Sequence, residues 1–129
     1  MFREFAKAPL TKVADSLDGI KVLHICGSTA KIIPYMVETG FDGISVEEAV
    51  SKIKPLVGDV KILGNVSSKS TLISGSTIDV RAEVIQSLNS GVDLLEPNCG
   101  ISPITPLRNI KAMVESRDEF YVNSDTHAQ

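Results

Sequence analysis

Apolar side chains follow two different spacings along the chain. Four short runs rich in Ile, Val and Leu predict buried strands: 20–26, 43–47, 60–67 and 92–100. Apolar residues at helical spacing precede the first run and follow each of the four: 2–18, 29–40, 49–58, 79–89 and 105–115. Gly19, Gly40 and Gly91 fall where three of these helices would end. The pattern therefore predicts one helix followed by four strand–helix units.

Strands that alternate with helices predict an α/β fold in which a parallel sheet is built by right-handed crossovers. Four consecutive βα units amount to half of a (β/α)8 TIM barrel, a fold of about 250 residues. A half barrel would expose two sheet edges and much of its apolar interior. We therefore expect that the chain closes as a small doubly wound sheet, associates with a partner half, or is a fragment.

Composition narrows the function classes. The 129 residues are 43% hydrophobic and carry a formal charge of −3, which gives no basic surface for nucleic acid. No apolar run is long enough to span a membrane, and residues 1–19 lack the pattern of a signal peptide. We expect a cytoplasmic protein, whose two cysteines are thiols or metal ligands rather than a disulfide.

Polar residues end all four predicted strands, at the edge where parallel α/β folds place their sites. They are His24 and Cys26, Ser45 and Glu47, Asn65 and Ser67, and Glu96, Asn98 and Cys99. Residues at i and i+2 of a strand face the same way, so His24 and Cys26 would point together.

Imidazole nitrogen and thiolate sulfur are the ligands that zinc prefers, and a catalytic zinc keeps three of them with one open position. His24 and Cys26 would supply two ligands, and Cys99, after the last strand, would supply the third. The alternative is that both cysteines are small buried apolar residues and that His24 is hydrogen-bonded in the core. Spacing leaves both interpretations open.

Three segments carry a family resemblance: "LHICGSTAKIIPYMVETGFDGISVEEAV", "ILGNVSSKSTLISGS" and "GVDLLEPNCGISPITPLRNIKAMVES". They resemble the C-terminal half of methylcobalamin:coenzyme M methyltransferases, which belong to the uroporphyrinogen decarboxylase (URO-D) superfamily of TIM barrels. The resemblance implies a URO-D-like half barrel over residues 1–117 and a polar tail over 118–129. It also implies that His24, Cys26 and Cys99 are zinc ligands.

The implied reaction, part of methanogenesis, moves a methyl group from methylcobalamin on a corrinoid protein to the thiol of coenzyme M. Zinc would ionise that thiol, because a coordinated thiol loses its proton. Glu47 could then be a catalytic proton acceptor, a partner of His24 or a further zinc ligand, or only a carboxylate at a helix start. Asn65 and Ser67 could bind the sulfonate of coenzyme M, or could be turn residues.

Half a barrel also leaves other functions open. The chain could be a truncated relative of the methyltransferases, a gene remnant, or a non-catalytic zinc-binding half barrel that pairs with itself or with a complementary half. A uroporphyrinogen decarboxylase-like lyase is a further alternative. Decarboxylases of the superfamily need no metal, so the H-x-C motif and the later cysteine argue against that activity.

Overall fold

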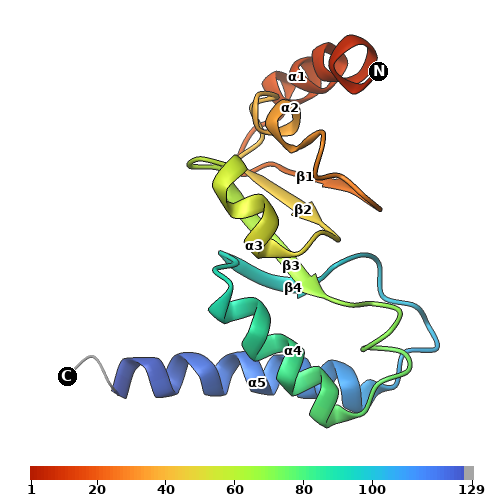
Figure 1. Ribbon diagram of the computed structural model, residues 1–129, viewed down its shortest axis with the longest axis vertical. Helices are drawn as coiled ribbons and strands as arrows, with labels where there is room; N and C mark the ends of the chain where they lie inside the picture. The colour runs from red at the N-terminus through yellow and green to blue at the C-terminus, as the bar shows by residue number, and fades with distance from the viewer. Residues whose placement is uncertain (127–129) are drawn as a thin grey trace.

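A single parallel sheet organises residues 1–126, the part of the chain that the computed structural model describes. Its strands lie in sequence order: β1 (Val22–Ile25), β2 (Gly43–Val46), β3 (Lys61–Val66) and β4 (Leu94–Pro97). Their arrows all point the same way in Figure 1. The predicted α/β fold of consecutive βα units is therefore confirmed, and the order is that of a barrel half rather than of a doubly wound sheet.

Helical segments precede the sheet and follow each strand. The elements are η1, a π-helical segment (Phe2–Ala6), α1 (Lys7–Ser16), α2 (Ile33–Val37), α3 (Val50–Ile53), the 3-10 turn η2 (Lys54–Leu56), α4 (Thr77–Asn89) and α5 (Leu107–Thr126). The long connections after β3 and β4 extend beyond the strand ends (Figure 1). These connections, with the shorter ones after β1 and β2, form the rim that carries the candidate site.

Two aspartates fix the starts of strands. Asp42, just before β2, accepts a hydrogen bond from the backbone N–H of Lys21 at 2.7 Å. Asp93, just before β4, accepts the N–H of Ile62 at 2.9 Å. Asp42 thus binds the residue just before β1, and Asp93 binds a residue of β3. Because each carboxylate links one strand start to the neighbouring strand, the two aspartates help to set the register of the sheet.

The hydrophobic core lies between one face of the sheet and the helices. It joins strand residues to α2, α3 and α4, and its fully buried members include Ile33, Met36, Ile44, Val46, Ile53, Ile62, Val66, Val80 and Val84. Burying a side chain of this size contributes about 1.5–3 kcal/mol. This core fixes the strands, and so fixes the positions of the side chains at their ends.

The opposite face of the sheet is open in the described part of the chain. Val22 is 41% exposed and Leu94 is 57% exposed, although both belong to strands. With Gly43 and Leu63 they line a groove of about 420 Å³. β1 and β4 each pair with one neighbour, which leaves both sheet edges free among residues 1–126. This is the geometry expected for half a barrel.

The helix limits differ from the sequence-based expectation in two places. The last helix was expected to end near Glu115, but α5 continues to Thr126, so residues 118–126 of the predicted tail are helical and 127–129 lie outside the described residues. Residues 29–40 were expected to form a helix, but α2 spans only Ile33–Val37 and no side chain caps it. Residues 30–32 form a turn instead.

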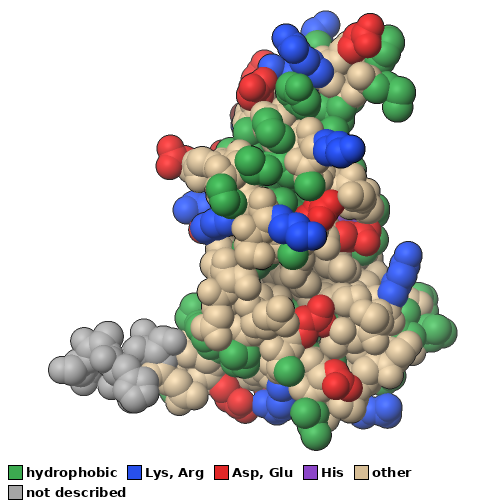
Figure 2. All heavy atoms as spheres, viewed as in Figure 1, with side chains coloured by type: hydrophobic (Ala, Val, Ile, Leu, Met, Phe, Trp, Pro, Cys, Tyr) green, Lys and Arg blue, Asp and Glu red, His purple; other side chains and the backbone are tan. Residues whose placement is uncertain are grey.

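The face of the molecule in Figure 2 shows no segregation of charge. Lys and Arg side chains are interspersed with Asp and Glu over the face in Figure 2, and hydrophobic side chains gather over the N-terminal helical segment. No helix within residues 1–126 is long and apolar enough to cross a membrane.

Candidate metal centre

His24, Cys26 and Cys99 meet at the rim of the sheet. His24 lies in β1, Cys26 directly follows that strand, and Cys99 lies two residues beyond β4. The Nε2 atom of His24 is 3.2 Å from the Sγ atom of Cys26, which is 3.4 Å from the Sγ atom of Cys99. One potential ligand atom from each residue fits within a 4.8 Å span. The structure therefore brings together all three predicted metal ligands.

The turn after β1 sets the direction of the Cys26 thiol. Gly27 has φ of 80°, a conformation that side chains disfavour, so the chain reverses directly after the cysteine. The N–H of Gly27 donates to Oε1 of Glu47 at 2.9 Å. Glu47 thus holds this turn from the neighbouring β2 unit, and it lies close enough to raise the pKa of the Cys26 thiol by charge repulsion, after the larger effects of Cys99 and burial.

The ring of His24 is oriented by Ser45, its register partner on β2. Nδ1 lies 3.1 Å from the carbonyl oxygen of Ser45 and 2.9 Å from its hydroxyl. Since a carbonyl only accepts hydrogen bonds, Nδ1 carries a proton, and the neutral ring would therefore present the lone pair of Nε2 toward the cysteines. The Ser45 hydroxyl donates in turn to Oε1 of Glu96. A carboxylate–serine–histidine chain of this kind is typical of metal-binding histidines.

The two thiols differ in their tendency to ionise. The pKa of Cys99 is lowered from its usual value, mainly by the hydrogen bond that the protonated His24 ring can donate to its sulfur, and secondarily by Cys26. The pKa of Cys26 is raised, mainly by its hydrogen bond to Cys99. In both residues it is the thiolate, rather than the thiol, that binds a metal.

The donor set fits zinc. Around a tetrahedral zinc ion, with bonds of about 2.3 Å to sulfur and 2.0–2.1 Å to nitrogen, neighbouring ligand atoms lie about 3.5–3.8 Å apart. Two of the three observed separations, 3.2 and 3.4 Å, are close to that range, and all three ligand atoms lie within 4.8 Å of one another. Three protein ligands leave the fourth position open. The adjoining pocket, of about 370 Å³, is lined by His24, Ser45, Glu96, Cys99 and Ile101 among others.

Glu47 and Glu48 have distinct surroundings. Glu47 is half-buried and contacts the cluster only through the Gly27 turn; it contributes no atom to the group of three ligand residues. Glu48 accepts hydrogen bonds from the Ser28 hydroxyl at 2.9 Å and from the N–H groups of Thr29 and Ala30. The Ser28 hydroxyl and then the Ala30 N–H lower the pKa of Glu48, so this carboxylate holds the loop after β1 in its ionised form.

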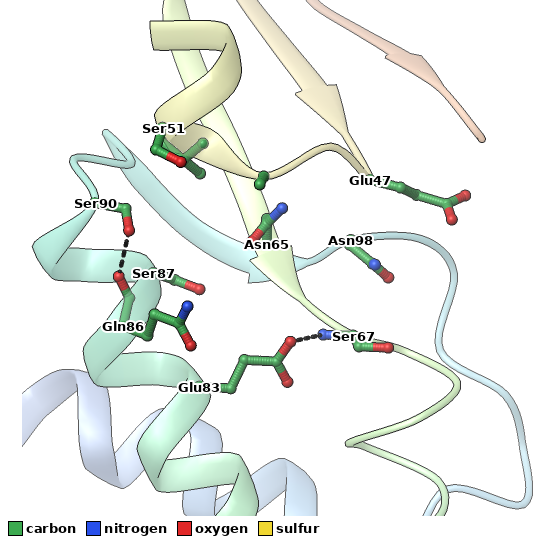
Figure 3. A pocket seen from close by; sticks show the side chains of 11 residues that line it. Glu47, Ser51, Asn65, Ser67, Glu83, Gln86, Ser87, Ser90 and Asn98 are labelled. Carbon is green, nitrogen blue, oxygen red and sulfur yellow. Dashed lines mark hydrogen bonds between the residues drawn. The ribbon is translucent and has the colours of Figure 1, made fainter. Parts of the chain in front are cut away.

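Asn65 and Ser67 line a different pocket, of about 320 Å³, between the strand ends and the helices α3 and α4 (Figure 3). The amide of Asn65 donates to the Glu48 carbonyl at 2.6 Å, and the N–H of Ser67 donates to Oε1 of Glu83 at 3.1 Å. This pocket shares no lining residue with the pocket beside His24 and Cys99. The structure therefore does not bring Asn65 and Ser67, the two predicted substrate-binding residues, to the pocket beside His24 and Cys99.

Ser45 contacts His24, and Glu96 contacts Ser45, although in the sequence both residues are only polar strand ends. The signal that would find them is register: Ser45 pairs with His24 across β1 and β2. Glu96 lies on β4, one strand beyond β3, and reaches Ser45 across the open face.

Comparison with known proteins places this geometry in context. Residues 1–120 match the family described as Uroporphyrinogen decarboxylase (URO-D). A methylcobamide:CoM methyltransferase, MtaA of Methanosarcina barkeri, is 44% identical over 124 residues, which are 93% of this chain and 37% of the relative. MtbA of Methanosarcina acetivorans, also a methylcobamide:CoM methyltransferase, is 38% identical over 125 residues, with 92% and 37% coverage.

A solved structure gives the same result for the fold. A methyltransferase from Methanosarcina mazei superposes with a TM-score of 0.89 at 45% identity, and the match covers 93% of this chain and 37% of that one. The chain thus spans little more than a third of the length of the relatives that it matches.

Proposed function

The chain belongs to the uroporphyrinogen decarboxylase (URO-D) family, and from that premise we propose that it carries the zinc centre of a methyltransferase that moves a methyl group from a methylated corrinoid to the thiol of coenzyme M. The observation that carries the proposal is the meeting of one imidazole nitrogen and two sulfurs, within 4.8 Å, at the C-terminal edge of a parallel sheet. The similarity to methylcobamide:CoM methyltransferases supports the substrate assignment.

The residues of the proposed centre have separate roles. Cys26, Cys99 and Nε2 of His24 would hold the ion, and Ser45 keeps the His24 ring in the tautomer that leaves Nε2 free. A zinc ion bound there would supply Lewis-acid activation of the substrate thiol, which would attack the methyl carbon of the corrinoid as a thiolate. Two thiolate ligands keep the centre's charge near neutral, which favours a nucleophilic sulfur.

The thiol proton needs an acceptor, and the chain offers two carboxylates. Glu96 reaches the pocket beside Cys99 and is hydrogen-bonded to Ser45. Glu47 holds the Gly27 turn that follows Cys26, and it lines the pocket of Asn65 and Ser67. We propose Glu47 as the acceptor or as a residue that positions Cys26. The place of Asn65 and Ser67 in the separate pocket supports a role in shaping the rim rather than in binding the sulfonate.

The open face of the sheet supports a further part of the proposal, that a complementary half barrel covers it. Val22 and Leu94 are exposed on this face, and the relatives are far longer than this chain. Closing the barrel would bury these side chains and add the strand ends that a corrinoid protein and coenzyme M would contact.

A direct test is to assay the transfer of the methyl group from methylcobalamin to coenzyme M, with zinc supplied. The loss of the methyl–cobalt absorption measures the reaction. Transfer that requires both thiol ligands supports the proposal. Zinc binding without transfer would instead identify a non-catalytic zinc-binding half barrel. If transfer occurs when a complementary half is present and stops when that half is removed, the half supplies residues that the reaction needs.

A further inference from the structure

We propose that Cys26 and Cys99 give this site a second, covalent state, in which the metal-free protein closes an intramolecular disulfide between them and loses its capacity to bind metal. The inference concerns the two thiols themselves, and it does not require that the chain transfers methyl groups. It assigns a reversible modification site to residues whose proposed role is to hold a metal.

The geometry of the two sulfurs is the first support. Their Sγ atoms lie 3.4 Å apart although 73 positions separate the residues in sequence. A disulfide bond is about 2.05 Å long, so closure requires an approach of about 1.4 Å, within the range of small side-chain rotations. Each cysteine is followed by a glycine, and a Cβ placed on Gly27 or Gly100 would have no atom within 4 Å. The space beside both thiols is therefore open to small movements of their side chains.

The surrounding contacts hold the pair in place before any bond forms. The Ser68 hydroxyl accepts the N–H of Cys99 at 3.2 Å and donates to its carbonyl at 2.9 Å, so one side chain binds both backbone groups of this cysteine. On the other side, Glu47 holds the turn after Cys26 through Gly27. Because the fold fixes both segments, the local concentration of one thiol at the other far exceeds that in an unfolded chain.

Both thiols are within reach of a small oxidant. Cys26 is exposed and Cys99 is half-buried, and Cys99 lines an open pocket of about 370 Å³. Hydrogen peroxide is the oxidant in this proposal. One thiol attacks a peroxide oxygen, which breaks the O–O bond and yields a sulfenic acid and water; the second thiol attacks that sulfur and releases a second water. Both sulfurs are oxidised and the peroxide is reduced.

The consequence is that oxidation and metal binding exclude each other. A disulfide removes two of the three ligand atoms, and His24 alone cannot retain the ion. Conversely, zinc bound to both thiolates shields them from peroxide. Reduction by dithiothreitol would restore the thiols and the metal site.

To test the proposal, the metal-free chain and the zinc-loaded chain are each treated with hydrogen peroxide. Both samples are then alkylated in denaturant, and their free thiols and intact masses are measured. We expect the metal-free monomer to lose two hydrogens and escape alkylation, with Cys26 and Cys99 in one cross-linked peptide pair, and zinc to slow this reaction at least about tenfold. Cys26→Ser and Cys99→Ser serve as matched controls, since neither can form the intramolecular bond.

A second comparison separates the folded geometry from chance pairing. In concentrated urea the same oxidation should yield the intramolecular disulfide at least about tenfold more slowly, because the unfolded chain lacks the fixed approach of the two thiols. Equal rates in both states, sulfinic acids without a disulfide, or cross-linked dimers as the main product would each overturn the proposal. A disulfide that forms in a chain that never binds zinc would overturn the proposed zinc centre and the exclusion between metal and oxidation, while the disulfide itself would stand.

Discussion

The Nδ1 atom of His24 lies 3.1 Å from the backbone carbonyl of Ser45, the residue opposite it on the neighbouring strand. This contact decides which ring nitrogen faces the two cysteines. It depends on the parallel register of β1 and β2, so the fold itself selects the tautomer that a metal requires.

Substitution of Ser45 by Ala removes the hydroxyl that contacts both His24 and Glu96 but keeps the backbone carbonyl. We expect zinc affinity to fall by about 10- to 100-fold, the usual effect of losing such a supporting group. Competition with a chromogenic chelator measures the affinity. Ser67→Ala, in the separate pocket, is the matched control and should bind zinc as the unchanged chain does. Equal losses in both variants would show that Ser45 has no specific role.

Asn109 connects the loop after β3 to α5. Its amide donates to the carbonyls of Leu72 at 3.0 Å and Gly75 at 2.8 Å, and the residue is fully buried. Asn109→Ala removes the donor from one buried and one part-buried carbonyl, so we expect the free energy of unfolding to fall by about 1–3 kcal/mol. Urea denaturation followed by circular dichroism measures the change. Asn109→Asp, which also lacks the donors, should be at least as unstable, and wild-type stability in both would contradict this account.

Ser76 and Asp79 form a reciprocal cap at the start of α4: the Ser76 hydroxyl accepts the Asp79 N–H, and Asp79 accepts the Ser76 N–H. Ser76→Ala should lower stability by about 1 kcal/mol. The Ser76 hydroxyl and N–H lower the pKa of Asp79 from 3.8. The contribution of ionised Asp79 to the free energy of unfolding is complete above the pKa that Asp79 has in the unfolded chain. It is lost as the pH falls through the lower pKa that Asp79 has in the folded chain. Urea midpoints of Asp79→Asn and the unchanged chain should therefore differ at neutral pH and converge in acid.

The open face of the sheet leads us to expect that the chain associates through it. Val22 and Leu94 line the same exposed groove, so replacing both by Lys places charge on the surface that a complementary half would cover. We expect the unchanged chain to associate or to bind a hydrophobic dye, and the double variant to do so much less. Light scattering and dye fluorescence measure the two effects. A compact monomer that binds no dye would contradict the assignment of this face as an interface.

Runs of Ile, Val and Leu predicted all four strands, because such runs are typical of parallel strands that are covered on both faces. Here one face is open, and Val22 and Leu94 are exposed on it. The end of α5 could not be predicted in the same way. Its polar continuation is held by tertiary contacts, since Arg81 of α4 bonds Glu115 and Glu119 at 2.9 Å each and Phe120 packs against the core. The sequence around residue 118 cannot indicate a contact with Arg81, because the two segments are far apart in the chain.

The candidate site was predictable to the extent that strand geometry governs it. Alternation brings His24 and Cys26 to one face, and the common edge of parallel strands brings Cys99 to them. The support from Ser45 requires knowledge of register, which the pattern of apolar residues does not supply. The side chain of Asn65 was the least predictable, because its contact with the Glu48 carbonyl depends on the loop after β2.

The most direct test of the central claim is the zinc content of the purified chain and of its thiol variants, measured by atomic emission after removal of loosely bound metal. The account predicts about one zinc ion per chain, lost in both Cys26→Ser and Cys99→Ser while Ser67→Ala keeps it. Thiol variants that retain the metal of the unchanged chain, or an unchanged chain that binds none when zinc is supplied, would contradict it.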